Sequence, residues 1–252
     1  MIEIILLSFI QGLTEFIPVS SSSHLILVSE YLNFDNKNLS IDVSLHIGSF
    51  FAVLFYFKKE VLNFIKYKEL FLKILVSSIP VIILGFILVK SNAIDALRDV
   101  RIIGLTTIIF GLLLFFSDRL ETKKDMNKNF DYKSAIIIGI LQILSLIPGV
   151  SRSGISITAA RFLNFKRSDS AKISFLLSLP TLAAVSIYGL KNIFLSENLN
   201  YSTINLIAIL LSGIFSYLTI KYFLIYTKKF SLKFFVIYRI ILSIIIFTII
   251  YY

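Results

Sequence analysis

Long apolar runs alternate with short polar segments along most of the chain. A helix needs about 20 predominantly apolar residues to span the hydrocarbon core of a bilayer. Six runs approach this length, rich in Ile, Leu, Phe and Val and almost free of charge inside. The pattern therefore predicts six membrane-spanning helices, at about residues 41–57, 74–90, 101–117, 170–190, 204–225 and 234–251.

Two further apolar stretches are interrupted in the middle. Residues 1–32 are broken by Pro18 and four consecutive serines, and residues 134–165 are broken by Pro148 and the polar sequence after it. Each half has only about a dozen residues, too few to cross alone. Because interrupted backbone cannot face lipid, we expect two re-entrant helix–loop–helix hairpins whose loops are buried in protein. The first stretch lacks the basic start of a signal peptide.

Composition supports a membrane protein and excludes several kinds of site. Of the 252 residues, 57% are apolar and 16% charged, with a mean hydropathy of +0.87. A soluble domain has about 45–50% apolar and about 25% charged residues. The net charge of +10 comes from lysines between apolar runs, which favours membrane-protein loops over a nucleic-acid surface. The absence of cysteine excludes disulfides and Cys-type zinc clusters, and two histidines argue against a multi-histidine metal site.

The positive charges predict which loops face the cytoplasm. Segments 58–73, 118–133, 161–172 and 226–233 together carry 17 Lys and Arg residues. The opposite set has only five, namely Lys37, Lys90, Arg98, Arg101 and Lys191. The richer set is expected inside. Both termini then lie outside, the first hairpin enters from outside and the second from the cytoplasm.

The two interrupted hairpins predict an inverted repeat within one membrane domain, 1–252. Gln11 and Pro18 followed by serines resemble Gln142 and Pro148 followed by Ser151, and the two prolines are 130 positions apart. Each half, 1–125 and 126–252, then contains one hairpin and three spans. Because three is odd, the second half is inserted upside down, a plan used for membrane sites that handle polar ligands.

Polar side chains concentrate in the first hairpin, where they would be costly without a role. Gln11 and Glu15 are four apart and share one helix face. The serines after Pro18 begin a new helix, whose N-terminus attracts anions. Ser21 and His24 are three apart, so their side chains can meet, the minimum for an activated nucleophile; alternatively His24 itself attacks phosphorus.

The second hairpin supplies a cation and more hydroxyls. Ser151, Arg152 and Ser153 follow Pro148 at a predicted helix N-terminus, and the planar guanidinium of arginine suits phosphate oxygens. Two helix N-termini and one arginine at a single depth would suit two linked phosphates. Glu15 would repel that anion unless a divalent cation lay between them, with Mg²⁺ or Ca²⁺ as the hard-cation choices.

Structural interpretations compete at each position. The serine run can simply allow close helix packing, Glu15 can face an aqueous cleft, and Arg152 can be a structural anchor. His46, near the outer end of a span, is expected to be packed or wet rather than catalytic. Lys221 and Arg239 are expected to extend along the lipid to an interface.

The interrupted motifs resemble a known family. The stretch Gln11–Leu25 resembles the first signature of bacterial undecaprenyl-diphosphatase of the bacitracin-resistance type, and Pro148–Gly154 resembles the second. Leu45–Ser49, the length and the span pattern are also similar, so the resemblance covers nearly the whole chain.

The resemblance implies a plasma-membrane hydrolase that removes the terminal phosphate of undecaprenyl diphosphate at the outer face and regenerates the peptidoglycan lipid carrier. It implies a divalent cation, Mg or Ca, with Glu15 as the signature acid and Gln11 where the family has Glu or Gln. Ser21 and His24 both match proposed nucleophiles. The residues implied in binding the diphosphate are Ser20, Ser21, Ser22, Ser151, Arg152 and Ser153, and Ser23 stands where many members have Gly.

Two other functions compete with hydrolysis. Inverted repeats with interrupted helices also suit a polyprenyl-phosphate flippase or a secondary transporter, which would need no Ser–His pair. An ion channel fits less well, since no filter motif is present in the sequence.

Overall fold

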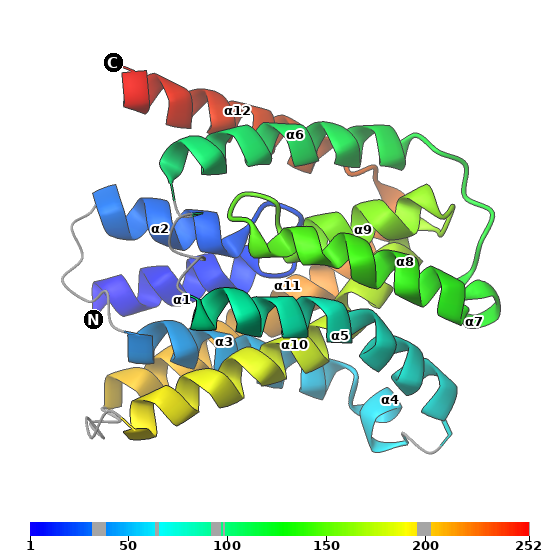
Figure 1. Ribbon diagram of the computed structural model, residues 1–252, viewed down its shortest axis with the longest axis horizontal. Helices are drawn as coiled ribbons and strands as arrows, with labels where there is room; N and C mark the ends of the chain where they lie inside the picture. Colours follow the sequence, from blue (N-terminus) through cyan, green and yellow to red (C-terminus); the bar gives the residue numbers. More distant parts are fainter. Residues whose placement is uncertain (32–38, 64–65, 92–96, 98, 196–202, 252) are drawn as a thin grey trace.

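The computed structural model describes residues 1–31, 39–63, 66–91, 97, 99–195 and 203–251. These residues form an all-helical protein (Figure 1). Its helices are α1 Ile2–Thr14, α2 Ser21–Tyr31, α3 Leu39–Tyr56, α4 Lys58–Leu62, α5 Lys68–Lys90, α6 Val100–Asp118, α7 Met126–Asn129, α8 Tyr132–Gln142, η2 Ile143–Leu146, α9 Arg152–Phe162, α10 Arg167–Leu195, α11 Thr203–Lys229 and α12 Lys233–Tyr251.

Five helices are long and apolar enough to cross a membrane. They are α5, α6, α10 over Arg167–Lys191, α11 and α12, and each contains one of the predicted spans. The remaining predicted span, 41–57, is α3, which belongs with the shorter apolar helices of the described chain. The fold class of a helical membrane protein is therefore confirmed, while the arrangement of six spans plus two hairpins stays a prediction.

Both interrupted stretches form hairpins, as expected. Helix α1 turns at Pro18 into α2, and α8 turns through η2 and Pro148 into α9. Figure 1 shows the two hairpins entering from opposite ends of the molecule, with their loops close together near its middle. Both chain ends lie at the end from which the α1–α2 hairpin enters.

The four lysine-rich segments share the other end of the molecule. Lys172 Nζ forms an ion pair with Glu60 Oε1 at 3.0 Å, and Arg167 Nε pairs with Asp118 Oδ1 at 2.6 Å. The amide of Leu232 donates to Asp118 Oδ2 at 3.0 Å. These contacts confirm the grouping of the four segments. Which side of the membrane they face stays a prediction, and Lys37 and Arg98 of the opposite set lie outside the described residues.

Helices of each predicted half pack on helices of the other half. Helix α1 packs on α11 and α8 packs on α5, while α6 packs on α12. Glycine permits both close approaches, because a Cβ at Gly12 would lie 2.5 Å from Phe215 Cβ and one at Gly139 would lie 2.7 Å from Ser77 Cα. An inverted repeat would pack its helices in this way, and both the repeat and its boundary at residue 125 stay predictions.

Candidate functional site

The two hairpin loops end in the same unusual backbone conformation. Ser20 has φ 78° and Ser151 has φ 73°, values that L-residues seldom adopt. Each serine directly precedes an 11-residue helix, α2 or α9. The turn thus aims a helix N-terminus back toward the middle of the molecule. Strained backbone of this kind persists only where surrounding contacts fix it.

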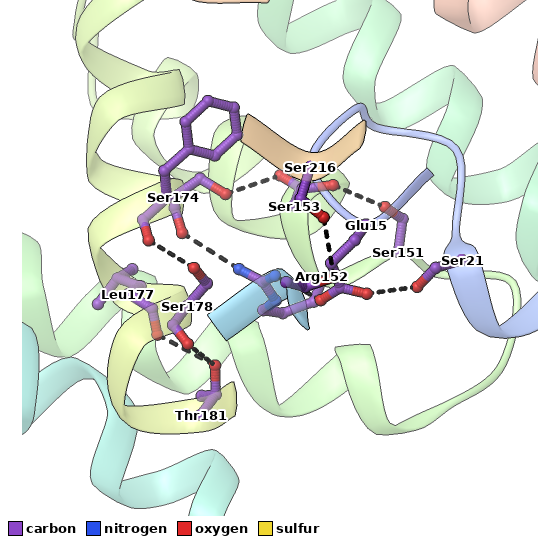
Figure 2. Close-up of polar contacts among 12 residues, drawn as sticks. Glu15, Ser21, Ser151, Arg152, Ser153, Ser174, Leu177, Ser178, Thr181 and Ser216 are labelled. Atoms are coloured by element: carbon purple, nitrogen blue, oxygen red, sulfur yellow. Dashed lines mark hydrogen bonds and ion pairs between the residues drawn. The ribbon is translucent and has the colours of Figure 1, made fainter. Parts of the chain in front are cut away.

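Glu15 is the centre of the polar contacts between the hairpins. It is only 7% exposed, and its Oε2 accepts hydrogen bonds from Ser21 Oγ at 2.6 Å and Gln11 Nε2 at 3.1 Å. Its Oε1 accepts from Arg152 Nη2 at 2.6 Å (Figure 2). The structure therefore brings four predicted site residues from both hairpins into one cluster.

Arg152 is held in place by more than its carboxylate partner. Its Nη1 donates to the carbonyl oxygen of Ser174 in α10 at 3.3 Å (Figure 2). Its guanidinium lies 6.0 Å from the ring centroid of Phe16, which packs edge-on against Phe175. The guanidinium is thus held between α10 and the Phe16 ring. This position orients its planar group of donors for binding an oxyanion.

Serine hydroxyls connect the two loops. Ser153 Oγ donates to the carbonyl of Ile17 at 2.8 Å and lies 3.2 Å from Ser151 Oγ. Ser151 caps α9, because its Oγ accepts from the amide of Gly154 at 3.1 Å. Both serines are buried, so part of their hydrogen-bonding capacity is already used to join and shape the loops.

The remaining serines of the first loop lie in two environments. Ser20 and Ser23 are buried and their hydroxyls are 3.0 Å apart. Ser22 lies on the exposed side of α2, with its hydroxyl 3.3 Å from that of Ser20. Ser21 is partly exposed beside them. The site is therefore accessible along the first turn of α2.

We expected His24 to pair with Ser21, but its ring nitrogens contact other groups. Its Nδ1 lies 2.6 Å from the carbonyl of Ser20, and its Nε2 lies 2.6 Å from Tyr238 Oη on α12. Since a carbonyl only accepts, Nδ1 carries a proton, and when the ring is neutral Nε2 accepts from the tyrosine hydroxyl. The expectation was wrong because Glu15, from the turn before α2, is the partner that reaches Ser21.

Gln11 and Glu15 offer two oxygens that could hold a hard cation. Gln11 is fully buried and its Oε1 has no hydrogen-bond partner among the described residues. Its Nε2 is bonded to Glu15, so the unused oxygen belongs to the same cluster. Within the described ranges no group of three or more His, Asp or Glu side chains could form a complete metal site. A cation here would need further oxygens from a phosphate ligand, as Mg²⁺ commonly does.

Arg239 is the residue that sequence reasoning placed wrongly. We expected it to reach an interface, but it is 0% exposed and donates to carbonyls of both hairpin loops, whereas Lys221 is exposed as expected. A charge in the middle of an apolar run was the available signal, since such residues usually face the protein interior. Nothing in the sequence singled out Tyr238. His46 donates Nδ1–H to the carbonyl of Asp42 in its own helix, and its ring lies close enough to Glu15 to interact with the charge of that carboxylate.

This arrangement joins a hydroxyl, a base and a cation. The Ser21 hydroxyl points at a carboxylate that can take its proton, and the same carboxylate holds Arg152. A nucleophile in contact with its base, with an oxyanion-binding cation on the other side of that base, provides the components of group transfer to water.

Comparison with known proteins gives matches over nearly the whole chain. The family model described as "Bacitracin resistance protein BacA" matches residues 4–245. The undecaprenyl-diphosphatase of Pelagibacter ubique (strain HTCC1062) is 49% identical over 252 residues, covering 99% of this chain and 98% of its own. Those of Saccharophagus degradans and Hahella chejuensis are 40% and 39% identical, covering 95% and 96% of this chain and 94% and 95% of their own.

Proposed function

Because this chain belongs to the bacitracin resistance protein BacA family, we propose that it is a membrane phosphatase that hydrolyses undecaprenyl diphosphate to undecaprenyl phosphate and inorganic phosphate. The observation that carries the proposal is the contact of Glu15 with both Ser21 and Arg152. These are the groups that phosphoryl transfer needs, brought together from opposite hairpins inside an apolar protein.

In the proposed reaction the Ser21 oxygen attacks the terminal phosphorus while Glu15 accepts the hydroxyl proton. The bond between this phosphorus and the bridging oxygen breaks, and Glu15 passes its proton to the departing undecaprenyl phosphate. Water then attacks the phosphoserine and loses a proton to Glu15. The bond between phosphorus and the Ser21 oxygen breaks, Glu15 returns the proton to that oxygen, and inorganic phosphate leaves. Arg152 exchanges its bond to Glu15 for the phosphate oxygens and stabilises the charge of the transition state.

His24 is the alternative nucleophile. Its Nε2 has the lone pair that an attack on phosphorus would need, but Tyr238 Oη occupies that position. Ser21 already contacts its base, whereas His24 would first have to break the bond to Tyr238. The geometry therefore favours Ser21 as the nucleophile and His24 as a neighbour that orders the first turn of α2.

A divalent cation, Mg or Ca, would be held by Glu15 and the unpaired oxygen of Gln11, completed by substrate phosphates. It would neutralise phosphate charge beside the Glu15 carboxylate. Gln11 contributes a neutral amide where a second carboxylate would bind more strongly.

We also place the site toward the outer face of a bacterial plasma membrane. The support is the clustering of the lysine-rich segments at the end opposite the entry of the α1–α2 hairpin. Hydrolysis there would return the lipid carrier for peptidoglycan synthesis and so confer resistance to bacitracin. The isoprenoid tail would lie among the apolar helices.

The direct test is phosphate release by the purified chain in detergent. We expect undecaprenyl diphosphate to be cleaved to the monophosphate and inorganic phosphate, with chelator abolishing the reaction. Intact diphosphate after incubation with wild-type protein and either cation would reject the proposed function.

A polyprenyl-phosphate carrier is the second candidate, and the specific observation behind it is that the two hairpin loops meet from opposite ends. Transport of labelled lipid phosphate between vesicle leaflets measures it. Transport that persists after Ser21→Ala would separate it from hydrolysis.

A further inference from the structure

Arg239 lies fully buried in the middle of α12, between both hairpin loops and α6. Its guanidinium forms five hydrogen bonds, all to backbone carbonyls. Nε donates to Thr107 at 3.0 Å, Nη1 donates to Pro18 at 3.2 Å and Val150 at 3.1 Å, and Nη2 donates to Gly149 at 2.8 Å and Thr106 at 3.5 Å.

These bonds use all five N–H donors that a guanidinium possesses. Three of the acceptors are in the hairpin loops, with Pro18 in the first and Gly149 and Val150 in the second. Among the described residues Arg239 has these carbonyl partners and no ion pair. An uncompensated cation at this depth is costly, and an apolar side chain would fill the space without that cost. The five guanidinium donors, which an apolar side chain lacks, therefore explain an arginine at this position.

The surroundings are shaped to admit this side chain. A Cβ at Gly154 would lie 3.1 Å from Nη1 of Arg239, and a Cβ at Gly111 would lie 3.3 Å from its Cβ. The second loop is also tied to α6, because Thr106 Oγ1 donates to the carbonyl of Pro148 at 2.6 Å. The guanidinium therefore connects both loops to helix α6 through hydrogen bonds.

We propose that Arg239 is a positioning residue that fixes the two hairpin loops against each other, so that Ser21 and Arg152 both reach Glu15. Among the described residues its hydrogen bonds go to backbone carbonyls and to none of these three side chains, so it acts through the loop backbone. The catalytic consequence rests on the proposed function, while the joining of the loops does not.

Hydrogen exchange and kinetics on full-length protein test this proposal together. Exchange is followed by mass spectrometry in peptides covering residues 15–24 and 147–154, for wild type, Arg239→Gln and Arg239→Lys. Lys221→Gln is the matched control, since it removes the exposed cation of the neighbouring α11. The same samples are assayed for kcat and KM on undecaprenyl diphosphate.

We expect Arg239→Gln to raise exchange in both loops at once and to lower kcat by about 100-fold or more, the scale of one lost preorganised donor. Arg239→Lys keeps the charge but not the fork, so both effects are intermediate. Lys221→Gln changes neither. A general loss of fold would instead raise exchange throughout the chain.

Unchanged exchange in both loops of a folded Arg239 variant would overturn the proposal, as would a rise confined to one loop. If Arg239→Gln does not fold, Arg239→Lys decides by the same criterion. A rise in both loops accompanied by an inactive wild-type protein would support the joining of the loops and reject the proposed function.

Discussion

Glu15 and Arg152 are 137 positions apart in the chain, and their side chains meet at 2.6 Å between Oε1 and Nη2. The pair is almost completely withdrawn from solvent, with side chains 7% and 13% exposed. Removing one partner of such a pair leaves an uncompensated charge and costs about 3–5 kcal/mol. A diphosphate supplies negative charge that can replace Glu15 as the partner of Arg152, so the ion pair keeps the cation ready for substrate.

The first prediction distinguishes the two candidate nucleophiles. Ser21→Ala removes the attacking oxygen, so we expect phosphate release to fall by at least about a thousandfold. His24→Ala removes two hydrogen bonds worth about 1 kcal/mol each, which corresponds to a loss of about thirtyfold. Steady-state release of phosphate from undecaprenyl diphosphate measures both.

The control for this comparison is Ser91→Ala, which removes an exposed hydroxyl at the end of α5 and should leave the rate unchanged. A larger loss for His24→Ala than for Ser21→Ala would reverse the assignment. Trapping of a phosphorylated peptide in the α2 region would support Ser21 directly.

The second prediction concerns the cation. Gln11→Glu adds a second carboxylate beside Glu15, so the Mg²⁺ or Ca²⁺ concentration that restores half-maximal activity after chelation should fall by about tenfold. Gln142→Glu is the matched control, because it alters the other buried glutamine, on α8. Equal cation requirements for wild type and Gln11→Glu would remove Gln11 from the proposed cation site.

The third prediction concerns packing between α1 and α11. An added methyl at Gly12 would come within 2.5 Å of Phe215 Cβ and 2.9 Å of the Ser216 amide, so Gly12→Ala should lower stability by about 1–3 kcal/mol. At Gly85 the nearest atom is the flexible end of Leu146 at 3.2 Å, and Gly85→Ala should be nearly neutral. Thermal unfolding in detergent compares the two, and similar melting temperatures would contradict the close packing.

The fourth prediction concerns orientation. The chain has no cysteine, so single cysteines give unambiguous labels. In intact cells we expect a membrane-impermeant maleimide to label Ser91→Cys, directly after α5, and to spare Lys123→Cys, between α6 and α7. Both positions are exposed, and Figure 1 shows the end of α5 and the connection from α6 to α7 toward opposite ends of the molecule. Lys123→Cys should react once the membrane is permeabilised. The opposite labelling would place the site toward the cytoplasm.

The sequence predicted the hairpins because proline and serine clusters interrupt two apolar runs. The interrupted backbone would leave polar groups without hydrogen-bond partners in lipid, so the chain must turn inside the protein. It placed Glu15 and Arg152 at one site because polar groups in equivalent loops have few other uses at that depth. The predicted partner of Ser21 was wrong. Spacing within α2 indicated His24, but the turn at Ser20 brings the start of α2 beside Glu15, which accepts the hydrogen bond from Ser21.

Arg239 shows why long-range contacts escaped the sequence. The rest of its helix is mostly apolar, so the sequence predicted that its side chain extends along lipid to an interface. Its five acceptors are backbone carbonyls, which every residue possesses and which leave no mark on side-chain pattern. Only the packing of α12 beside both loops shows the role of this arginine.

The measurement that tests the central claim most directly is a double-mutant cycle on undecaprenyl diphosphate hydrolysis with Glu15→Gln, Arg152→Gln and both together. The exposed ion pair of Asp125 and Lys166 serves as the control cycle, with no expected loss. If the two hairpins build one site, each single change lowers kcat/KM by about 100-fold or more, and the double variant loses little beyond the worse single. Losses that multiply independently, or a fully active single variant, would contradict a shared site.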